Sequence, residues 1–331
     1  MTNKNSLQVV ALAGGVGGAK LAHGLSQVLK PGRLTVIVNS GDDFEHLGLK
    51  ICPDLDTVCY TLAGIADPTK GWGRWDETWN TLESLEELGG PAWFRLGDRD
   101  LGTHLERTRL LSMGWTLCQI TDEFRRAWKI EQTIIPVTDD YVPTIVDTDV
   151  GMLPFQEYFV KQQCRPVVRG FKFDKVDYSK PAPGVLDAIQ EAELVVICPS
   201  NPWVSIDPIL AIPGVRKELL SNANPIIAVS PIIGGEAVKG PAAKMYSEMG
   251  FKPSALTVAE HYGSRIIEGI LSGFVMDNTD KNMCVEIQKK GLQTLVTNTL
   301  MKSLNDRQRL AEEVLEFGKE LIRLNIGLHG E

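Results

Sequence analysis

Apolar runs that end in glycine-rich or polar turns mark the first forty residues of the chain. Gln8 to Leu12 is such a run, and the glycines after it predict a buried parallel strand. From Gly18 to Leu29 leucines recur every fourth residue, as on one side of a helix, and Pro31-Gly32 ends the pattern. A second β-branched run, Leu34 to Val38, follows. Strand, glycine turn, helix and strand together predict a βαβ unit.

The same periodicities extend the prediction along the chain. Helical spacing is predicted over four further segments: 56–66, 76–89, 103–128 (as two helices interrupted near Gly114) and 301–324. Buried strands are expected at Glu193 to Cys198 and at Pro225 to Val229. Residues 131–180 are richer in short strands and prolines, which indicates an insertion or cap.

These elements predict an α/β fold, a Rossmann-like three-layer sandwich with a mostly parallel sheet and an inserted cap. We expect one domain over residues 1–331. The helix at 301–324 carries an apolar stripe that is expected to dock on the core or on a second copy of the chain: Leu304, Leu310, Val314, Phe317 and Leu321.

Charge and composition exclude several classes of protein. A net charge of -8 over 331 residues disfavours nucleic acid and anionic membranes as partners, because phosphates attract Lys and Arg surfaces. No apolar run approaches the roughly 20 residues of a membrane span, and the polar segment Met1 to Ser6 lacks signal-peptide features. The expected location is the cytoplasm. The six cysteines form no C-x-x-C pair and are expected to be reduced thiols.

The glycine turn between the first strand and helix is the first candidate for chemistry. A strand that ends in Gly14-Gly15 and opens a helix at Gly17-Gly18 exposes backbone N–H groups to an anion, and Lys20 follows. The pattern is neither a Walker A motif nor a complete G-x-G-x-x-G, and Asn39 stands where a dinucleotide-binding protein carries an acid. A phosphate site and a purely structural turn both remain open.

Acidic residues follow the second strand and precede the next helix. Asp42-Asp43 and the pair Asp54 and Asp56 fall where carboxylates can hold Mg²⁺ together with phosphate oxygens. Asp54 or Asp56 could instead cap the helix that follows, and residue spacing alone does not decide between these interpretations.

Three further loops are candidates for ligand contacts. Asp98 and Arg99 follow a presumed strand and could clamp a ligand or form a surface salt bridge. The loops Pro199 to Ile206 and Ser230 to Ala242 each follow a buried strand, at the sheet edge where open α/β folds bind ligands. Ordinary βα loops are the alternative.

Six motifs occur in a fixed order: Gly14–Lys20, Asn39–Asp43, Pro53–Thr57, Leu96–Asp100, Pro199–Pro202 and Ser230–Gly235. Together they resemble the 2-phospho-L-lactate transferase family, from about residue 8 to the C-terminal helix. Members of that family make the deazaflavin coenzyme F-420. They move a phospholactyl or phosphoenolpyruvyl group from a guanosine diphosphate conjugate to the deazaflavin Fo and release GMP, with Mg²⁺ as cofactor.

The resemblance implies the same activity here, a Rossmann-like core and a homodimer. Which three-carbon acid is carried (lactyl, enolpyruvyl or glyceryl) stays open. A non-enzymatic regulator that binds UDP-sugars is the alternative from a related family. An NAD-dependent oxidoreductase is disfavoured by Asn39 and by the incomplete glycine fingerprint.

The resemblance also implies roles for particular residues. Nucleotide contacts are implied for Gly14, Gly15, Gly17, Gly18, Lys20, Ser200, Asn201, Ser205, Ile206, Ser230, Ile232, Gly235, Lys239 and Gly240. Contacts to Fo are implied for Ser40, Gly41, Asp42, Asp56, Asp98 and Arg99. Asp42, Asp54 and Asp56 would hold the metal, and the catalytic residues would be Asp54, Asp56 and Arg99. Four tryptophans would either flank the flat deazaflavin or pack in the core: Trp72, Trp75, Trp79 and Trp93.

Overall fold

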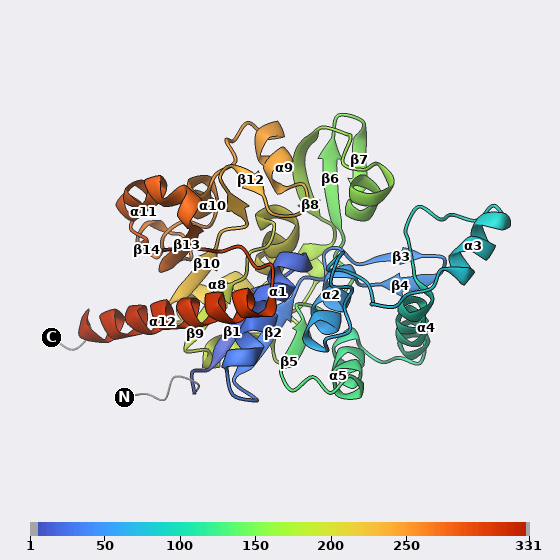
Figure 1. Cartoon of the computed structure of the whole chain (residues 1–331), viewed down its shortest axis with the longest axis horizontal. Helices are drawn as coiled ribbons and strands as arrows, with labels where there is room; N and C mark the ends of the chain where they lie inside the picture. Colours follow the sequence, from blue (N-terminus) through green and yellow to red (C-terminus); the bar gives the residue numbers. More distant parts are fainter. Residues whose placement is uncertain (1–5, 329–331) are drawn as a thin grey trace.

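Seven parallel strands form the central sheet, in the order β14-β13-β10-β9-β1-β2-β5 (Figure 1). The computed structural model describes residues 6–328, so the polar N-terminal segment lies almost wholly outside it. The strands are β1 (Val9–Ala13), β2 (Leu34–Val38), β5 (Thr133–Pro136), β9 (Leu194–Ile197), β10 (Ile226–Val229), β13 (Gly273–Asp277) and β14 (Gln293–Thr297).

The strand order creates a crevice at one place on the sheet edge. Numbered along the chain, the strands lie 3-2-1-4-5-6-7, so the winding reverses between β1 and β9. In doubly wound folds, the loops after the two strands at such a switch point diverge and leave room for a ligand. Here these loops are the glycine turn after β1 and the segment Cys198 to Asn201 after β9.

Helices cover both faces of the sheet, which makes the three layers that the sequence predicts. Alternate residues of β1 belong to two different apolar clusters, because successive strand side chains point to opposite faces. One face is covered by α1 (Gly15–Val28), α2 (Pro53–Leu62), α5 (Leu117–Ala127) and α12 (Leu304–Leu328). The other is covered by α6 (Val185–Glu191), α7 (Asp207–Ala211), α8 (Val215–Ser221), α9 (Ala242–Glu248), α10 (Ala255–Tyr262) and α11 (Cys284–Lys289).

The C-terminal helix α12 packs along α1 (Figure 1). The two backbones approach so closely that a Cβ on Gly24 would lie 2.2 Å from the carbonyl oxygen of Arg307. Four residues of the predicted stripe are buried in this contact or against the sheet, whereas Leu304 is exposed. The stripe thus docks on the core of its own chain.

Part of the expected insertion at 131–180 belongs to the central sheet, because β5 pairs with β2. The remainder builds a separate antiparallel sheet from β6 (Thr144–Thr148), β7 (Gly151–Pro154) and β8 (Val168–Phe173). Smaller elements complete the fold: β3 (Phe44–His46), β4 (Leu49–Ile51), α3 (Asn80–Glu87), α4 (Asp98–Ser112), β11 (Ile232–Ile233) and β12 (Glu236–Ala237). Between residues 6 and 328, no helix has the length and apolar character needed to span a bilayer.

Candidate active site

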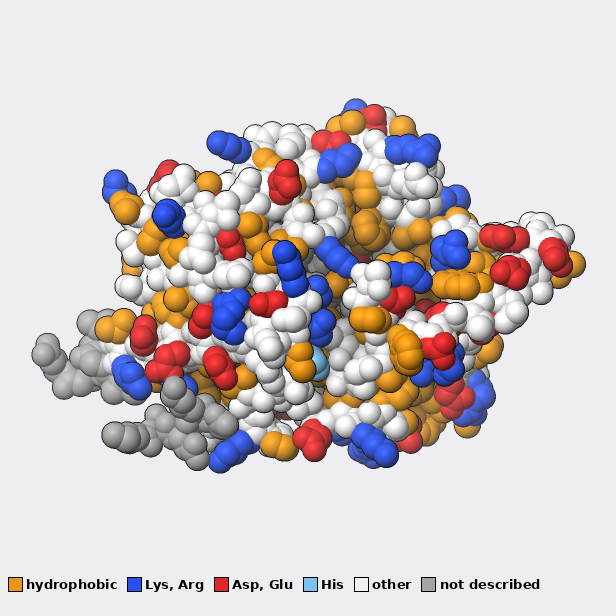
Figure 2. All heavy atoms as spheres, viewed as in Figure 1, with side chains coloured by type: hydrophobic (Ala, Val, Ile, Leu, Met, Phe, Trp, Pro, Cys, Tyr) orange, Lys and Arg blue, Asp and Glu red, His pale blue; other side chains and the backbone are white. Residues whose placement is uncertain are grey.

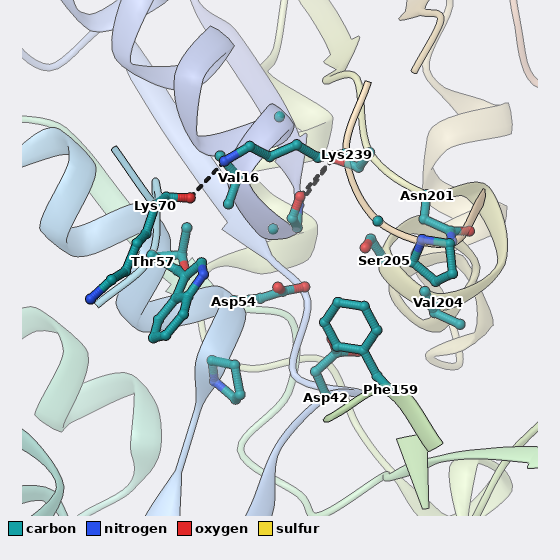
Figure 3. Close-up of a pocket in the computed structure, with 18 of the residues that line it drawn as sticks. Val16, Asp42, Asp54, Thr57, Lys70, Phe159, Asn201, Val204, Ser205 and Lys239 are labelled. Atoms are coloured by element: carbon teal, nitrogen blue, oxygen red, sulfur yellow. Dashed lines mark hydrogen bonds between the residues drawn. The ribbon is translucent and has the colours of Figure 1, made fainter. Parts of the chain in front are cut away.

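A cavity of about 680 Å³ opens at the carboxyl ends of the strands around the switch point (Figure 3). It brings together many of the residues that the sequence singles out: Gly14, Gly15, Gly17, Lys20, Asp42, Asp54, Asp56, Ser200, Asn201, Ser205, Ser230, Lys239 and Gly240. These residues come from five separate segments of the chain, and their meeting supports one common ligand site.

The glycine turn is packed tightly by neighbouring loops. A Cβ on Gly14 would lie 2.6 Å from both Asp54 Oδ2 and Ser205 Cβ, and one on Gly17 would lie 2.2 Å from the Pro199 carbonyl oxygen. Gly15 has a φ of +61°, a conformation that favours glycine. The turn therefore has a structural need for glycine besides any need of a phosphate.

We expect Gly17→Ala to destabilise the protein by about 1–3 kcal/mol, because the new methyl group meets the Pro199 backbone, which cannot rotate away. Gly102 in α4 is the matched control, since a Cβ added there would have nothing within 4 Å. Gly102→Ala is expected to stabilise α4 by roughly 0.5–1 kcal/mol. Urea unfolding of both variants measures the two effects, and a Gly17→Ala protein as stable as the parent would refute the packing argument.

Asn39, at the end of β2, holds two carboxylates together. Its Nδ2 lies 3.0 Å from Asp42 Oδ1, 2.9 Å from Asp54 Oδ2 and 3.0 Å from the Val204 carbonyl oxygen. Its Oδ1 accepts the Gly41 amide at 2.8 Å. An acidic side chain at position 39 would repel both aspartates. Asn39, which argues against NAD binding, is therefore the residue that allows the two carboxylates to lie together.

Asp42 and Asp54 are buried next to each other without a neutralising cation from a side chain among the described residues. Burial raises the pKa of Asp42 well above its ordinary value, and the Asp54 carboxylate raises it further. Burial also raises the pKa of Asp54 to about 6, although Asn39 and the Gly15 amide lower it. Such a pair is stabilised by a proton or by a divalent cation, and Mg²⁺ characteristically takes one or two carboxylates.

Asp56 lies in a different environment from Asp54. Both of its oxygens contact the guanidinium of Arg107, a side chain only 1% exposed, and Oδ2 lies 3.7 Å from His104 Nδ1. The carboxylate is already paired with a fixed cation, which argues against a role for Asp56 as a metal ligand. Within the described residues, no group of three or more His, Cys, Asp or Glu side chains is arranged to hold a metal.

Asp98 and Arg99, predicted to contact Fo, lie outside the cavity. Asp98 accepts hydrogen bonds from Thr78, Asn80 and Thr81 and so caps α3, and these bonds lower its pKa. The Arg99 side chain is about half exposed and donates to Asp76. Both side chains stabilise the surface segment 76–81 at the start of α3, so the structure supports the surface alternative for this pair.

Several other predicted contact residues also do not line the cavity: Gly18, Ser40, Gly41, Ile206, Ile232 and Gly235. Gly18 packs on Ser200, and Ile206 and Ile232 belong to the apolar core beneath the site. These residues shape the loops, and their neighbours in sequence present the polar groups.

Basic side chains surround the glycine turn although the chain is acidic overall. Figure 2 shows Lys and Arg side chains gathered near the middle of this face, where α1 begins in Figure 1. Lys20, Lys70, Arg95 and Lys239 line the cavity. Burial lowers the pKa of Lys20, and the charges of Arg307 and Lys239 lower it further. The concentration of positive charge indicates an anionic ligand.

Aromatic side chains line the cavity together with these basic groups. The sequence points to two of them, Trp72 and Trp93, whereas Trp75 and Trp79 are not in the lining. The sequence analysis does not predict that Phe94, which follows Trp93, or Phe155 and Phe159 of the cap line the cavity. The rings of Phe155 and Phe159 are stacked, with centroids 5.4 Å apart. Sequence alone could not find the cap residues, because their contribution depends on how the cap packs on the sheet.

The fold and the site define a doubly wound α/β protein whose ligand cavity lies at the topological switch point. The chain belongs to the 2-phospho-L-lactate transferase CofD family, whose sequence pattern matches residues 9–315. It is 40% identical over 320 residues to a phosphoenolpyruvate transferase of Streptomyces coelicolor, covering 95% of this chain and 99% of the relative. A phosphoenolpyruvate transferase of Thermobifida fusca is 42% identical over 292 residues, 84% of this chain and 89% of the relative.

A solved structure shares the fold at much lower sequence similarity. It is a member of the UPF0052 family from Bacillus halodurans, with a TM-score of 0.59 and 15% identity over 95% of this chain and 99% of that one. At this identity the similarity supports the α/β architecture and carries no information about the ligand.

Proposed function

We propose that this protein transfers a phosphoenolpyruvyl group from a guanosine diphosphate conjugate to a ribityl hydroxyl of the deazaflavin Fo and releases GMP. The Asp42–Asp54 pair beside the glycine turn carries the proposal, because a diphosphate donor needs a cation at this place. Relatives described as phosphoenolpyruvate transferases support the enolpyruvyl donor over the lactyl one.

Asp42 and Asp54 are the residues that would hold Mg²⁺. When bound, the ion would neutralise charge on the donor diphosphate. Lys20 and Lys239 supply further positive charge, and Asn201 and Ser205 line the same cavity (Figure 3). The aromatic side of the cavity, with Trp93 and the rings of the cap, provides flat apolar surfaces of the kind that a deazaflavin needs.

The direct test is a transfer assay with purified protein, Fo, Mg²⁺ and either the enolpyruvyl or the lactyl guanosine diphosphate conjugate. We expect GMP and a phosphodiester of Fo, formed faster from the enolpyruvyl donor. Faster transfer from the lactyl donor would overturn the donor assignment. No product from either donor, with tight binding of a UDP-sugar, would instead favour a non-enzymatic regulator. The cytoplasmic location and the homodimer stay predictions.

A further inference from the structure

Four aspartates line the cavity, and three of them have partners that define their use. Asp42 and Asp54 share Asn39 and face each other, and Asp56 is bound through both oxygens to Arg107. The fourth is Asp100, in the first turn of α4. Neither the metal site nor the buried ion pair requires Asp100.

The Asp100 carboxylate is fixed through one oxygen only. Tyr60 Oη donates to Oδ1 at 2.7 Å, and His104 Nε2 lies 3.3 Å from the same atom. Across residues 6–328, no hydrogen bond or ion pair is found at Oδ2. The side chain is 13% exposed and borders the cavity, so Oδ2 is an acceptor that a ligand can reach.

His104 is oriented from behind by Arg107. The guanidinium NH1 lies 3.1 Å from Nδ1, and because a guanidinium can only donate, Nδ1 accepts and Nε2 carries the proton that faces Asp100. Arg107 is in turn held by Asp56. Buried side chains of α2 and α4 therefore fix the position of the Asp100 carboxylate before any substrate arrives.

Asp100 lines the same cavity as the aromatic segment that precedes it in the chain. It follows closely the segment that contributes Trp93, Phe94 and Arg95 to the lining, and it contacts Tyr60, six residues beyond Asp54 in α2. Six residues of helix correspond to about 9 Å of backbone, so Tyr60 and the carboxylate that it holds lie farther along α2 than Asp54. A polyol chain whose hydroxyl reaches the Asp42–Asp54 pair would have the Asp100 carboxylate in the same cavity lining.

We infer that Asp100 is a catalytic residue that accepts the proton of the attacking hydroxyl, with Tyr60 and His104 as positioning residues. The inference rests on the proposed transfer reaction. The acceptor oxygen forms a bond to the phosphorus that carries the three-carbon acid, and the bond from this phosphorus to the bridging oxygen breaks. GMP leaves with that electron pair, and the hydroxyl proton passes to Asp100 Oδ2 and then to water.

The charged groups around Asp100 favour its ionised form. Burial raises the pKa of its carboxyl, but the close approach of His104, the hydrogen bond from Tyr60 and the charge of Arg107 outweigh burial and lower the pKa. The negative groups that face it are Asp56 on α2 and Glu77, whose Oε1 accepts the Asp100 amide at 2.8 Å. The carboxylate stays ionised at neutral pH, and it can take the proton as the bond to phosphorus forms, because the hydroxyl becomes much more acidic at that point.

The first test is Asp100→Asn, which keeps the shape and an acceptor for Tyr60 and His104 but removes the basic oxygen. We expect kcat to fall by about 10²–10⁴-fold, with the KM for the guanylylated donor and GDP binding nearly unchanged. Glu106→Gln is the matched control, because this residue of α4 pairs with Arg109 at the surface and does not line the cavity. The control is expected to retain parental kcat.

The second test is the pH profile of Tyr60→Phe, measured at saturating Mg²⁺ so that protonation of Asp54 does not set the acidic limb. Loss of the phenol removes a group that lowers the Asp100 pKa, so the acidic limb of kcat should move to higher pH by roughly 0.4–1 unit. Tyr60→Phe also keeps the inference testable if Asp100→Asn does not fold. An unmoved limb, or an Asp100→Asn enzyme with parental kcat, would overturn the role of Asp100. A parental protein that makes no product would instead refute the proposed function.

Discussion

Asp56→Asn is expected to lower the free energy of unfolding by about 3–5 kcal/mol. The substitution leaves the Arg107 guanidinium charged, 1% exposed and without its carboxylate partner. The removal of one member of a buried ion pair costs more than the pair itself contributes, because the remaining charge stays desolvated. The contacts of Arg107 with His104 and with the Lys50 carbonyl oxygen would remain, but neither partner neutralises the charge.

Urea unfolding at neutral pH measures this effect. Asp122→Asn is the control, since Asp122 pairs with Arg125 and Arg126 at the surface and such pairs contribute about 0–1 kcal/mol. The double variant Asp56→Leu with Arg107→Met should recover much of the lost stability, because neither charge is then buried alone. Equal stability of Asp56→Asn and Asp122→Asn would show that desolvation of Arg107 does not carry this cost.

Asp54→Asn is expected to abolish the stabilisation of the protein by Mg²⁺ and to reduce transfer by on the order of 10²–10³-fold. The substitution keeps the hydrogen-bonding shape next to Asn39 but removes one of the two carboxylates that would hold the ion. It also relieves the repulsion with Asp42, so without Mg²⁺ we expect the variant to be at least as stable as the parent at a pH of about 7.5.

The pH dependence gives a second readout of the same pair. Between the ordinary Asp value near 4 and about 6, folded Asp54 keeps a proton that the unfolded chain has lost, so the free energy of unfolding falls as the pH rises. A bound cation removes this penalty, and protons compete with it below a pH of about 6. Thermal unfolding should therefore show a larger rise of Tm with Mg²⁺ at a pH of about 7.5 than at about 5. An Asp54→Asn protein with the parental response to Mg²⁺ would contradict the assignment.

The sequence predicts those parts of the fold and site that depend on residues close together along the chain. The first βαβ unit and the loops after β9 and β10 are found because each combines an apolar run with turn residues. The sequence pattern places β5 in the cap because this strand is short and flanked by a proline-rich segment, and only its pairing with β2 reveals its place. β13 and β14 are not predicted from the sequence, because they lie in the part of the chain where the pattern of glycines and apolar runs is weaker.

The buried network of α2 and α4 shows where sequence analysis fails. Asp100, His104 and Arg107 recur at helical spacing on one side of α4, a polar stripe that would ordinarily indicate a solvent-exposed face. The structure buries this stripe against Tyr60 and Asp56 of α2, because the two helices meet beside the cavity. Helical spacing shows which residues share a face, but it does not show what that face contacts.

The Asp54 carboxylate rests against the glycine turn, where the Gly15 amide favours its ionised form. The chain thus supplies an anion of its own to the place where a phosphate would bind. Free inorganic phosphate, which is abundant in cells, would meet a like charge there unless a divalent cation accompanies it. We therefore expect the protein to resist inhibition by free phosphate. We also expect cation and donor to bind cooperatively, so that Asp54 disfavours phosphorylated metabolites that arrive without a divalent cation.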